Sequence, residues 1–221
     1  MPGKISPSMM CAPLHELSTY LSKFEQADIE YLHMDVMDGR FVPNFMLGTD
    51  FIKQVRKLSR IPLDIHLMIE KPEEKLDWFD IQAGEYVSFH IEATDHAQRL
   101  CESIRKKGAK AMLALNPSTA LCTLEDLLPD LDAVLIMTVN PGFAGQKLIP
   151  QTLDKIARLK EWLDKKSYPN IEIEVDGNTS QENAKKMRAA GADIFVAGTA
   201  GLFLEGRDIN QCIAEYRLCI E

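Results

Sequence analysis

Residues 171–198 read IEIEVDGNTSQENAKKMRAAGADIFVAG, and this stretch decides the fold. A short apolar run, Ile171–Asp176, leads into a segment of helical composition, Thr179–Ala190, and a second apolar run follows at Ile194–Gly198. The middle segment begins with Thr-Ser, a favourable N-cap, and stops before Gly191, a frequent C-terminal signal. Two buried strands joined by one capped helix are typical of a strand–helix–strand unit in a parallel sheet.

The same alternation runs through the rest of the chain. Helical periodicity is clearest in Ile149–Lys165, and Asp208–Ile220 closes the chain in the same way. Short apolar runs predict eight strands, at Lys4–Ser8, Tyr31–Asp35, Leu63–Leu67, Tyr86–His90, Lys110–Leu115, Ala133–Met137, Ile171–Asp176 and Ile194–Gly198. Eight strands, each followed by a helical segment, predict a TIM (β/α)8 barrel that forms a single domain over residues 1–221. An open doubly wound sheet is the alternative, but no G-x-G-x-x-G or P-loop follows the first strand.

The composition is that of an ordinary globular protein, with 46% hydrophobic and 26% charged residues. No apolar run is long enough to span a bilayer and the N-terminus lacks a signal peptide, which predicts a cytoplasmic protein without membrane contact. A net charge of −8 disfavours nucleic acid as a partner, but it is compatible with a locally built phosphate site. The five cysteines are odd in number and form no C-x-x-C pair, so we expect reduced thiols without a catalytic role.

In a (β/α)8 barrel the loops that follow the strands meet at one rim, where the active site lies. Four ionisable side chains fall at predicted strand ends: His33, Asp35, His66 and Asp176. His33 and Asp35 are two residues apart and therefore point to the same side of their strand. Two imidazoles and two carboxylates suit one divalent ion such as Zn²⁺, Mn²⁺, Fe²⁺ or Co²⁺, and suit the oxygen-preferring Mg²⁺ less well. Asp35 and Asp176 come from distant strands, so they can also exchange protons with opposite faces of one carbon.

Three turns that follow strands contain glycine and can present backbone amides to an anion. They comprise Gly142, Phe143, Ala144 and Gly145 after strand six, Gly177 and Asn178 after strand seven, and Gly198 and Thr199 after strand eight. Barrels commonly bind phosphate after their last two strands. Together these turns predict a small phosphorylated substrate.

Three methionines, Met37, Met68 and Met137, follow the ends of the second, third and sixth strands. Methionine most often fills the core. At this rim, however, the three side chains can form an apolar cap that excludes water from the acids and strengthens the charge interactions beneath it.

Other polar residues near the strand ends have simpler explanations. Asp64 and Glu174 lie one step inside the strand ends, and we expect them to be structural residues that can pair with lysines inside the barrel. His90 ends the fourth strand, and it can contact either the metal ligands or the substrate. His15 and His96 begin helical regions, where capping or surface roles are sufficient.

These motifs resemble the ribulose-phosphate 3-epimerase family, in order and over almost the whole chain. The matching segments are Ile5–Ser8 (ISPS), His33–Gly39 (HMDVMDG), Phe41–Asn44 (FVPN), Asp64–Met68 (DIHLM), Asn140–Gln146 (NPGFAGQ), Val175–Gly177 (VDG), Gly191–Asp193 (GAD) and Ala197–Thr199 (AGT). The resemblance implies an isomerase with one divalent ion held by His33, Asp35, His66 and Asp176, and with Asp35 and Asp176 as the acid/base pair. It also implies a methionine cap, a dimer or hexamer, and sugar-phosphate contacts from Ser8, His66, the 142–145 turn, Asp176, Gly177, Asn178, Gly198 and Thr199.

Within the family, several segments are more similar to the D-allulose-6-phosphate 3-epimerase branch. Residues 142–150, 171–177 and 198–203 carry this similarity. The pentulose enzymes typically have Gly-Gly after the strand-seven aspartate, where this chain has Gly177 and Asn178. A hexulose phosphate carries its phosphate one carbon farther from carbon 3, which fits altered phosphate turns. The sequence therefore favours epimerisation of D-allulose 6-phosphate to D-fructose 6-phosphate through a cis-enediolate, with D-ribulose 5-phosphate to D-xylulose 5-phosphate as the alternative.

Two other classes of protein stay open at this point. A metal-free barrel lyase usually carries a lysine in the acid cluster of the second or third strand, and residues 33–35 and 64–66 contain none. A non-catalytic sugar-phosphate-binding barrel would bind its ligand without exchanging the carbon-3 proton with solvent.

Overall fold

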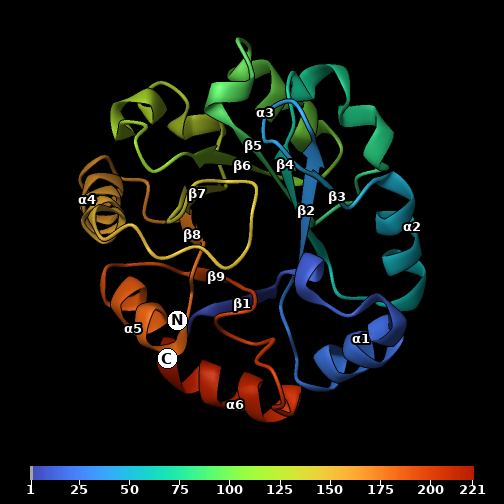
Figure 1. The fold of residues 1–221 in the computed structure, drawn as a ribbon. Helices are drawn as coiled ribbons and strands as arrows, with labels where there is room; N and C mark the ends of the chain where they lie inside the picture. The colour runs from blue at the N-terminus through green and yellow to red at the C-terminus, as the bar shows by residue number, and fades with distance from the viewer. Residues whose placement is uncertain (1) are drawn as a thin grey trace.

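The computed structural model describes residues 2–221, in which eight parallel strands curl into a barrel inside a ring of helices (Figure 1). The strands are β1 (Lys4–Pro7), β2 (Leu32–Asp38), β4 (Leu63–Met68), β5 (Tyr86–His90), β6 (Lys110–Leu115), β7 (Ala133–Met137), β8 (Glu172–Asp176) and β9 (Ile194–Ala197). β9 pairs in parallel with β1, and a parallel bridge between Ser8 and His33 joins β1 to β2 and closes the ring. The predicted (β/α)8 barrel is confirmed.

A short hairpin extends β2 beyond the predicted strand end at Asp35. After β2 the chain turns at Gly39 and returns as β3 (Phe45–Met46), which pairs antiparallel with Met37 and Asp38. Gly39 has a φ of +71°, and a Cβ at this position would lie 2.5 Å from the ring of Phe45. Glycine is therefore required on both conformational and steric grounds. The sequence analysis did not predict β3, because two residues are too few to show an alternating pattern.

Six α-helices surround the barrel (Figure 1). They are α1 (Leu17–Gln26), α2 (Thr49–Leu58), α3 (Ala97–Lys106), α4 (Gln151–Lys165), α5 (Gln181–Ala189) and α6 (Ile209–Ile220). The last three agree with the predicted helices to within two residues at each end. For α5 and α6 the caps explain this agreement: the Ser180 side chain accepts from the Asn183 amide, and the Asp208 side chain accepts from the amides of Asn210 and Gln211.

Two of the eight predicted helical connections contain 3-10 turns and no α-helix. The β4–β5 connection has turns at Pro72–Glu74 and Leu76–Phe79, and the β6–β7 connection has turns at Leu121–Leu124 and Leu128–Asp130. The first connection also has left-handed backbone at Lys71 and Asp80. Asp80, in the left-handed region, directly follows Leu76–Phe79 and ends that turn, whereas Pro72 and Pro129 stand in the first positions of their turns, where proline is tolerated. Shorter 3-10 turns also follow β1 and β5, at Met9–Cys11, Leu14–Glu16 and Ile91–Ala93.

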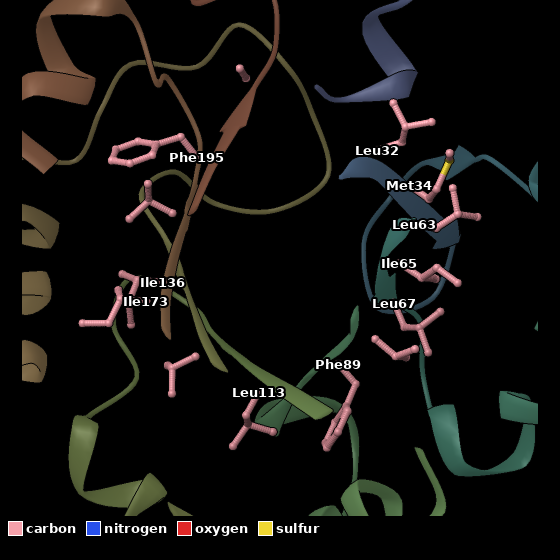
Figure 2. Packing of buried hydrophobic residues seen from close by; sticks show 14 of the residues in the cluster. Leu32, Met34, Leu63, Ile65, Leu67, Phe89, Leu113, Ile136, Ile173 and Phe195 are labelled. Carbon is pink, nitrogen blue, oxygen red and sulfur yellow. The ribbon is translucent and has the colours of Figure 1, made fainter. Parts of the chain in front are cut away.

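Alternate strand residues face two different environments. Leu32 and Met34 of β2 point to the same side as Leu63, Ile65 and Leu67 of β4, and all five belong to the large cluster that includes the buried faces of the helices (Figure 2). The intervening residues line the inside of the barrel. In β6 and β7 the buried inner residues are apolar, whereas β1, β2, β4, β5 and β8 contribute the buried polar residues Ser6, His33, Asp35, Asp64, His66, Ser88, His90 and Glu174. The buried polar groups therefore lie on the inner side of the barrel, away from β6 and β7.

No helix within residues 2–221 has both the length and the apolar character needed to cross a membrane.

Candidate metal centre and active site

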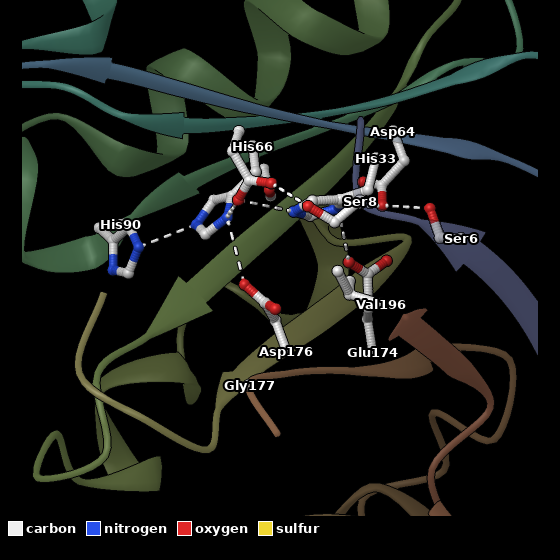
Figure 3. Close-up of polar contacts among 12 residues, drawn as sticks. Ser6, Ser8, His33, Asp64, His66, His90, Glu174, Asp176, Gly177 and Val196 are labelled. Carbon is white, nitrogen blue, oxygen red and sulfur yellow. Dashed lines mark hydrogen bonds and ion pairs between the residues drawn. The ribbon is translucent and has the colours of Figure 1, made fainter. Parts of the chain in front are cut away.

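Four side chains predicted from the strand ends meet at one point inside the barrel mouth. β2 supplies His33 and Asp35, β4 supplies His66, and β8 supplies Asp176 (Figure 3). Each of the four offers one ligand atom, and these atoms all lie within 4.8 Å of one another. Asp35 and His66 are direct partners in the β2–β4 register, so the sheet itself places them side by side.

The imidazole nitrogens that face this point have no hydrogen-bond partner among the described residues. Nε2 of His33 and Nδ1 of His66 are both buried and unpaired. The nearest carboxylate oxygens are Asp35 Oδ1, 3.4 Å from His33 Nε2, and Asp176 Oδ2, 3.8 Å from His66 Nδ1. Buried polar atoms without a partner are rare and call for a ligand or ion. Two such nitrogens facing two carboxylates fit the donor set of a divalent transition metal.

Asp35 and Asp176 differ in their surroundings. The Ser8 hydroxyl donates to Asp35 Oδ2 at 2.7 Å and fixes the orientation of this carboxylate. Burial raises the pKa of Asp176 to about 7, with His33 opposing this shift and the Asp35 charge adding to it. Asp176 can therefore change protonation state near neutral pH.

The turn after Asp176 requires glycine at position 177. Gly177 has a φ of +114°, and a Cβ at this position would lie 2.5 Å from Val139.

Asp64 orients His33 from inside the barrel. Asp64 Oδ2 lies 2.6 Å from His33 Nδ1 and also accepts a hydrogen bond of 2.9 Å from the Ser6 hydroxyl. A proton on Nδ1 that is donated to Asp64 leaves the Nε2 lone pair free to bind an ion. Although burial opposes it, the Asp64 and Asp35 carboxylates raise the pKa of His33 well above its ordinary value.

Glu174 lies against the same pair. Its Oε1 is 3.6 Å from His33 Nδ1, and burial together with the Asp64 charge raises its pKa well above the usual range. The expectation that Asp64 and Glu174 pair with lysines is therefore wrong. Glu172, two residues earlier on β8, is the acid that binds Lys4, at 2.7 Å. A period of two along β4 and β8 places these acids below the metal ligands, and this signal was present in the sequence.

His90 contacts His66, one of the candidate metal ligands, and does not line the cavity beside the two acids. Its Nε2 lies 2.9 Å from His66 Nε2, and its Nδ1 lies 3.3 Å from a carboxylate oxygen of Glu92. Of the two roles left open by the sequence, the structure places His90 behind His66.

An open cavity adjoins the two acids. Its lining contains most of the predicted substrate-binding and cap residues, namely Ser8, Met37, Met68, Met137, Gly142, Phe143, Ala144, Gly145, Gly177, Gly198 and Thr199. Six residues that were not among the predicted contacts also line the cavity: Met10, Cys11, Val139, Asn140, Pro141 and Val196. Asn140 and Pro141 belong to the Asn140–Gln146 motif, Val139 and Val196 stand close to the predicted turns, and Met10 and Cys11 follow Ser8.

Asn178 and His66 are the predicted substrate contacts that do not line the cavity. The Asn178 side chain donates to the Gln146 carbonyl at 2.6 Å and accepts from Asn183 at 2.8 Å. Asn178 therefore connects the end of β8 to the loop over the cavity. His66 lies deeper, with no exposed side-chain surface.

Comparisons with known proteins agree with this site. The ribulose-phosphate 3-epimerase family model matches residues 4–203. A ribulose-phosphate 3-epimerase of Bacillus subtilis is 41% identical over 197 residues, which cover 89% of this chain and 91% of that protein. Its counterpart in Escherichia coli K12 is 37% identical over 214 residues, covering 96% of this chain and 94% of that protein.

Solved structures with low sequence identity share the fold. The KGPDC of Streptococcus mutans, in a structure with a bound ligand, superposes with a TM-score of 0.72 at 13% identity, covering 99% of this chain and 97% of that one. N-(5'-phosphoribosyl)anthranilate isomerase from Pyrococcus furiosus has a TM-score of 0.63 at 14% identity, with 99% and 98% covered. At these identities the likeness concerns the fold alone.

The barrel, the opposed acids and the curated relatives define an enzyme of the isomerase class, an epimerase. More particularly, the chain belongs to the ribulose-phosphate 3-epimerase family.

Proposed function

We propose that this protein is a metal-dependent ketose-phosphate 3-epimerase that converts D-ribulose 5-phosphate to D-xylulose 5-phosphate. The observation that carries the proposal is the convergence of Asp35 and Asp176, from β2 and β8, beside two unpaired histidine nitrogens. The B. subtilis and E. coli relatives support the pentulose phosphate over the hexulose phosphate favoured by the turn sequences.

In the proposed reaction the two acids act on opposite faces of carbon 3. Asp35, oriented by Ser8, removes the proton next to the carbon-2 ketone, and Asp176 delivers a proton to the other face. Without a bound ion, burial raises the pKa of Asp176 to about 7, so this carboxyl group can hold and release a proton near neutral pH. When bound by His33, Asp35, His66 and Asp176, a divalent ion supplies positive charge that stabilises the cis-enediolate.

Substrate phosphate is proposed to bind at the three glycine-containing turns. Gly142, Gly145 and Gly177 all have positive φ values, so their backbones adopt conformations that can turn amides toward an anion. Met37 and Met68 are buried beside the cavity and cluster with Val42. This apolar wall excludes water from the acids and strengthens their charge interactions.

A second candidate substrate is D-allulose 6-phosphate, and Asn178 is the observation that favours it. The Asn178 side chain holds the loop over the cavity through the Gln146 carbonyl, at the position where the pentulose enzymes typically have glycine. If this tether sets the position of the phosphate, Asn178→Gly should increase the ratio of kcat/KM for the pentulose phosphate to that for the hexulose phosphate. Steady-state kinetics with both substrates measures that ratio.

The test of the proposed function compares both sugar phosphates in deuterated solvent. NMR should detect the carbon-3 epimer and deuterium at carbon 3, and metal analysis should find one divalent ion per chain, namely Zn²⁺, Mn²⁺, Fe²⁺ or Co²⁺ rather than Mg²⁺. Binding without deuterium incorporation would identify a sugar-phosphate-binding protein instead. Full activity after thorough chelation would favour metal-free chemistry.

A further inference from the structure

Three side chains in series, His66, His90 and Glu92, connect the candidate metal centre to the protein surface. His66 faces the centre with Nδ1, and its other nitrogen, Nε2, lies 2.9 Å from His90 Nε2. The two rings are stacked, with centroids 5.1 Å apart and an interplanar angle of 28°. His90 Nδ1 lies 3.3 Å from Glu92 Oε2 (the His66–His90 contact is dashed in Figure 3).

Only one arrangement of protons satisfies every contact when both rings are neutral. An ion on His66 Nδ1 requires the lone pair there, so the His66 proton is on Nε2. His66 Nε2–H then donates to His90 Nε2, which must carry a lone pair. The His90 proton is consequently on Nδ1, where it donates to Glu92. The 2.9 Å contact between the two Nε2 atoms itself requires a lone pair on one of them, which excludes two fully protonated rings.

Glu92 is the last side chain of this hydrogen-bonded series, and its carboxylate is held in place by further hydrogen bonds. Its second oxygen, Oε1, accepts the backbone amide of Asn116 at 3.0 Å and the hydroxyl of Thr119. Although burial opposes ionisation, hydrogen bonds from His90, Thr119 and Asn116 lower the pKa of Glu92 to about 2. A carboxylate held in this way is a permanent acceptor for the His90 proton.

We infer that His90 and Glu92 are positioning residues that hold His66 in its Nε2–H tautomer and direct Nδ1 to the divalent ion. This inference rests on the proposed function. The two histidine ligands are then oriented by different partners. His33 donates directly to the Asp64 carboxylate, whereas His66 donates to the neutral His90 ring, which in turn donates to Glu92. Groups that orient a ligating histidine in this way commonly change metal affinity by about 10- to 100-fold when they are removed.

The experiment measures Zn²⁺ affinity by competition with a chromogenic chelator. His90→Phe keeps a ring of similar size but removes the acceptor for His66 Nε2–H, so we expect Zn²⁺ affinity to fall by about 10- to 100-fold. His90→Gln supplies an amide oxygen that can accept the same proton, so affinity should return close to the parental value. Glu92→Gln keeps a neutral acceptor for the His90 proton and should cause a smaller loss. Two exposed positions give matched controls, His15→Gln and Glu161→Gln.

A spectroscopic measurement on the unmodified protein tests the tautomers directly. Long-range proton–nitrogen NMR of the zinc-loaded chain should show His66 protonated on Nε2 and His90 protonated on Nδ1. Unchanged Zn²⁺ affinity of His90→Phe, or a His66 proton on Nδ1, would overturn the inference. The NMR result does not depend on whether the variants fold.

The two proposals fail in distinguishable ways. If the parental chain binds Zn²⁺ and epimerises a ketose phosphate while His90→Phe matches it in affinity, only the positioning role is lost. If the parental chain binds none of Zn²⁺, Mn²⁺, Fe²⁺ and Co²⁺, the proposed function and the inference fall together.

Discussion

At the scale of single residues, the candidate site depends on which atom each side chain turns inward. His33 and His66 both present one unpaired nitrogen to the same point, and each has its other nitrogen engaged, by Asp64 and His90 respectively. Asp35 is oriented by Ser8, whereas Asp176 keeps some exposure to the cavity, with 17% of its side chain accessible. The two acids are thus unequal, although the proposed reaction uses both.

Asp176→Asn tests the two-acid mechanism. The amide cannot donate or accept the carbon-3 proton as a carboxyl group does, so we expect kcat to fall by about 10²- to 10⁴-fold at saturating Zn²⁺. The measurement is turnover of each sugar phosphate, with Asp50→Asn as control because its side chain is 95% exposed. A variant that retains parental activity would rule out a proton-transfer role for Asp176.

The same substitution should stabilise the metal-free protein, and the size of this effect should depend on pH. The folded-state pKa of Asp176 is about 7, above its ordinary value of 3.8, so the folded state holds this proton more tightly than the unfolded state. The stability contributed by this proton is complete below pH 3.8 and is lost as the pH rises through 7. Asp176→Asn should therefore stabilise the metal-free protein at about pH 8 and have little effect at about pH 4. Urea unfolding in the presence of chelator measures this difference, and equal effects at both pH values would contradict it.

At the scale of secondary-structure elements, short irregular segments complete the site. The β2–β3 hairpin pairs Met37 with Met46 and so supports one wall of the cavity. The loop after β7 lines another wall, where Gln146 donates to the carbonyls of Asn140 and Phe143. These segments have few regular backbone hydrogen bonds, and single glycines and side-chain amides hold them in place.

Gly39→Ala tests the hairpin. The added Cβ would meet the Phe45 ring at 2.5 Å in a backbone conformation with φ of +71°, and such strain costs about 1–3 kcal/mol of unfolding free energy. Because the hairpin supports Met37, KM for the sugar phosphate should rise as well. Gly48→Ala is the matched control, since no atom lies within 4 Å of its Cβ position and its φ is −72°. Equal stability of the two variants would show that the hairpin relaxes without strain.

At the scale of the whole molecule, barrel closure brings the two ends of the chain to one site. β9 pairs with β1, and the Ser8–His33 bridge joins β1 to β2, so β8 and β2 are held at fixed positions across the mouth. His33, His66 and Asp176 lie on β2, β4 and β8, so an ion that they share connects strands far apart in sequence. An ion bound there would therefore also cross-link the barrel.

Removal of the ion should lower the stability of the whole barrel. An ion present at about 100 times its Kd stabilises the folded state by about 2.7 kcal/mol, which corresponds to a shift in Tm of roughly 5–10 °C for a domain of this size. Differential scanning calorimetry with and without chelator measures the shift, and added Zn²⁺ should restore the original Tm. Identical melting curves would mean that the four residues hold no stabilising ion.

Much of the fold and of the site followed from the sequence. The eight apolar runs predicted all eight barrel strands, because a strand buried on both faces leaves a continuous apolar signal. The four candidate ligands were predictable because they fall toward the carboxyl ends of predicted strands, and the chain fixes the order of those strands in a barrel. The two-residue spacing of His33 and Asp35 was also informative, because residues i and i+2 of a strand point to the same side.

The partners of those ligands were decided only by the tertiary structure. Asp64 lies under His33, and His90 lies behind His66, because the register between neighbouring strands and the curvature of the closed barrel set which inner side chains meet. The lysine partners expected for Asp64 were wrong for this reason. A periodic pattern records the side on which a residue lies, whereas its contacts depend on every strand that closes the ring.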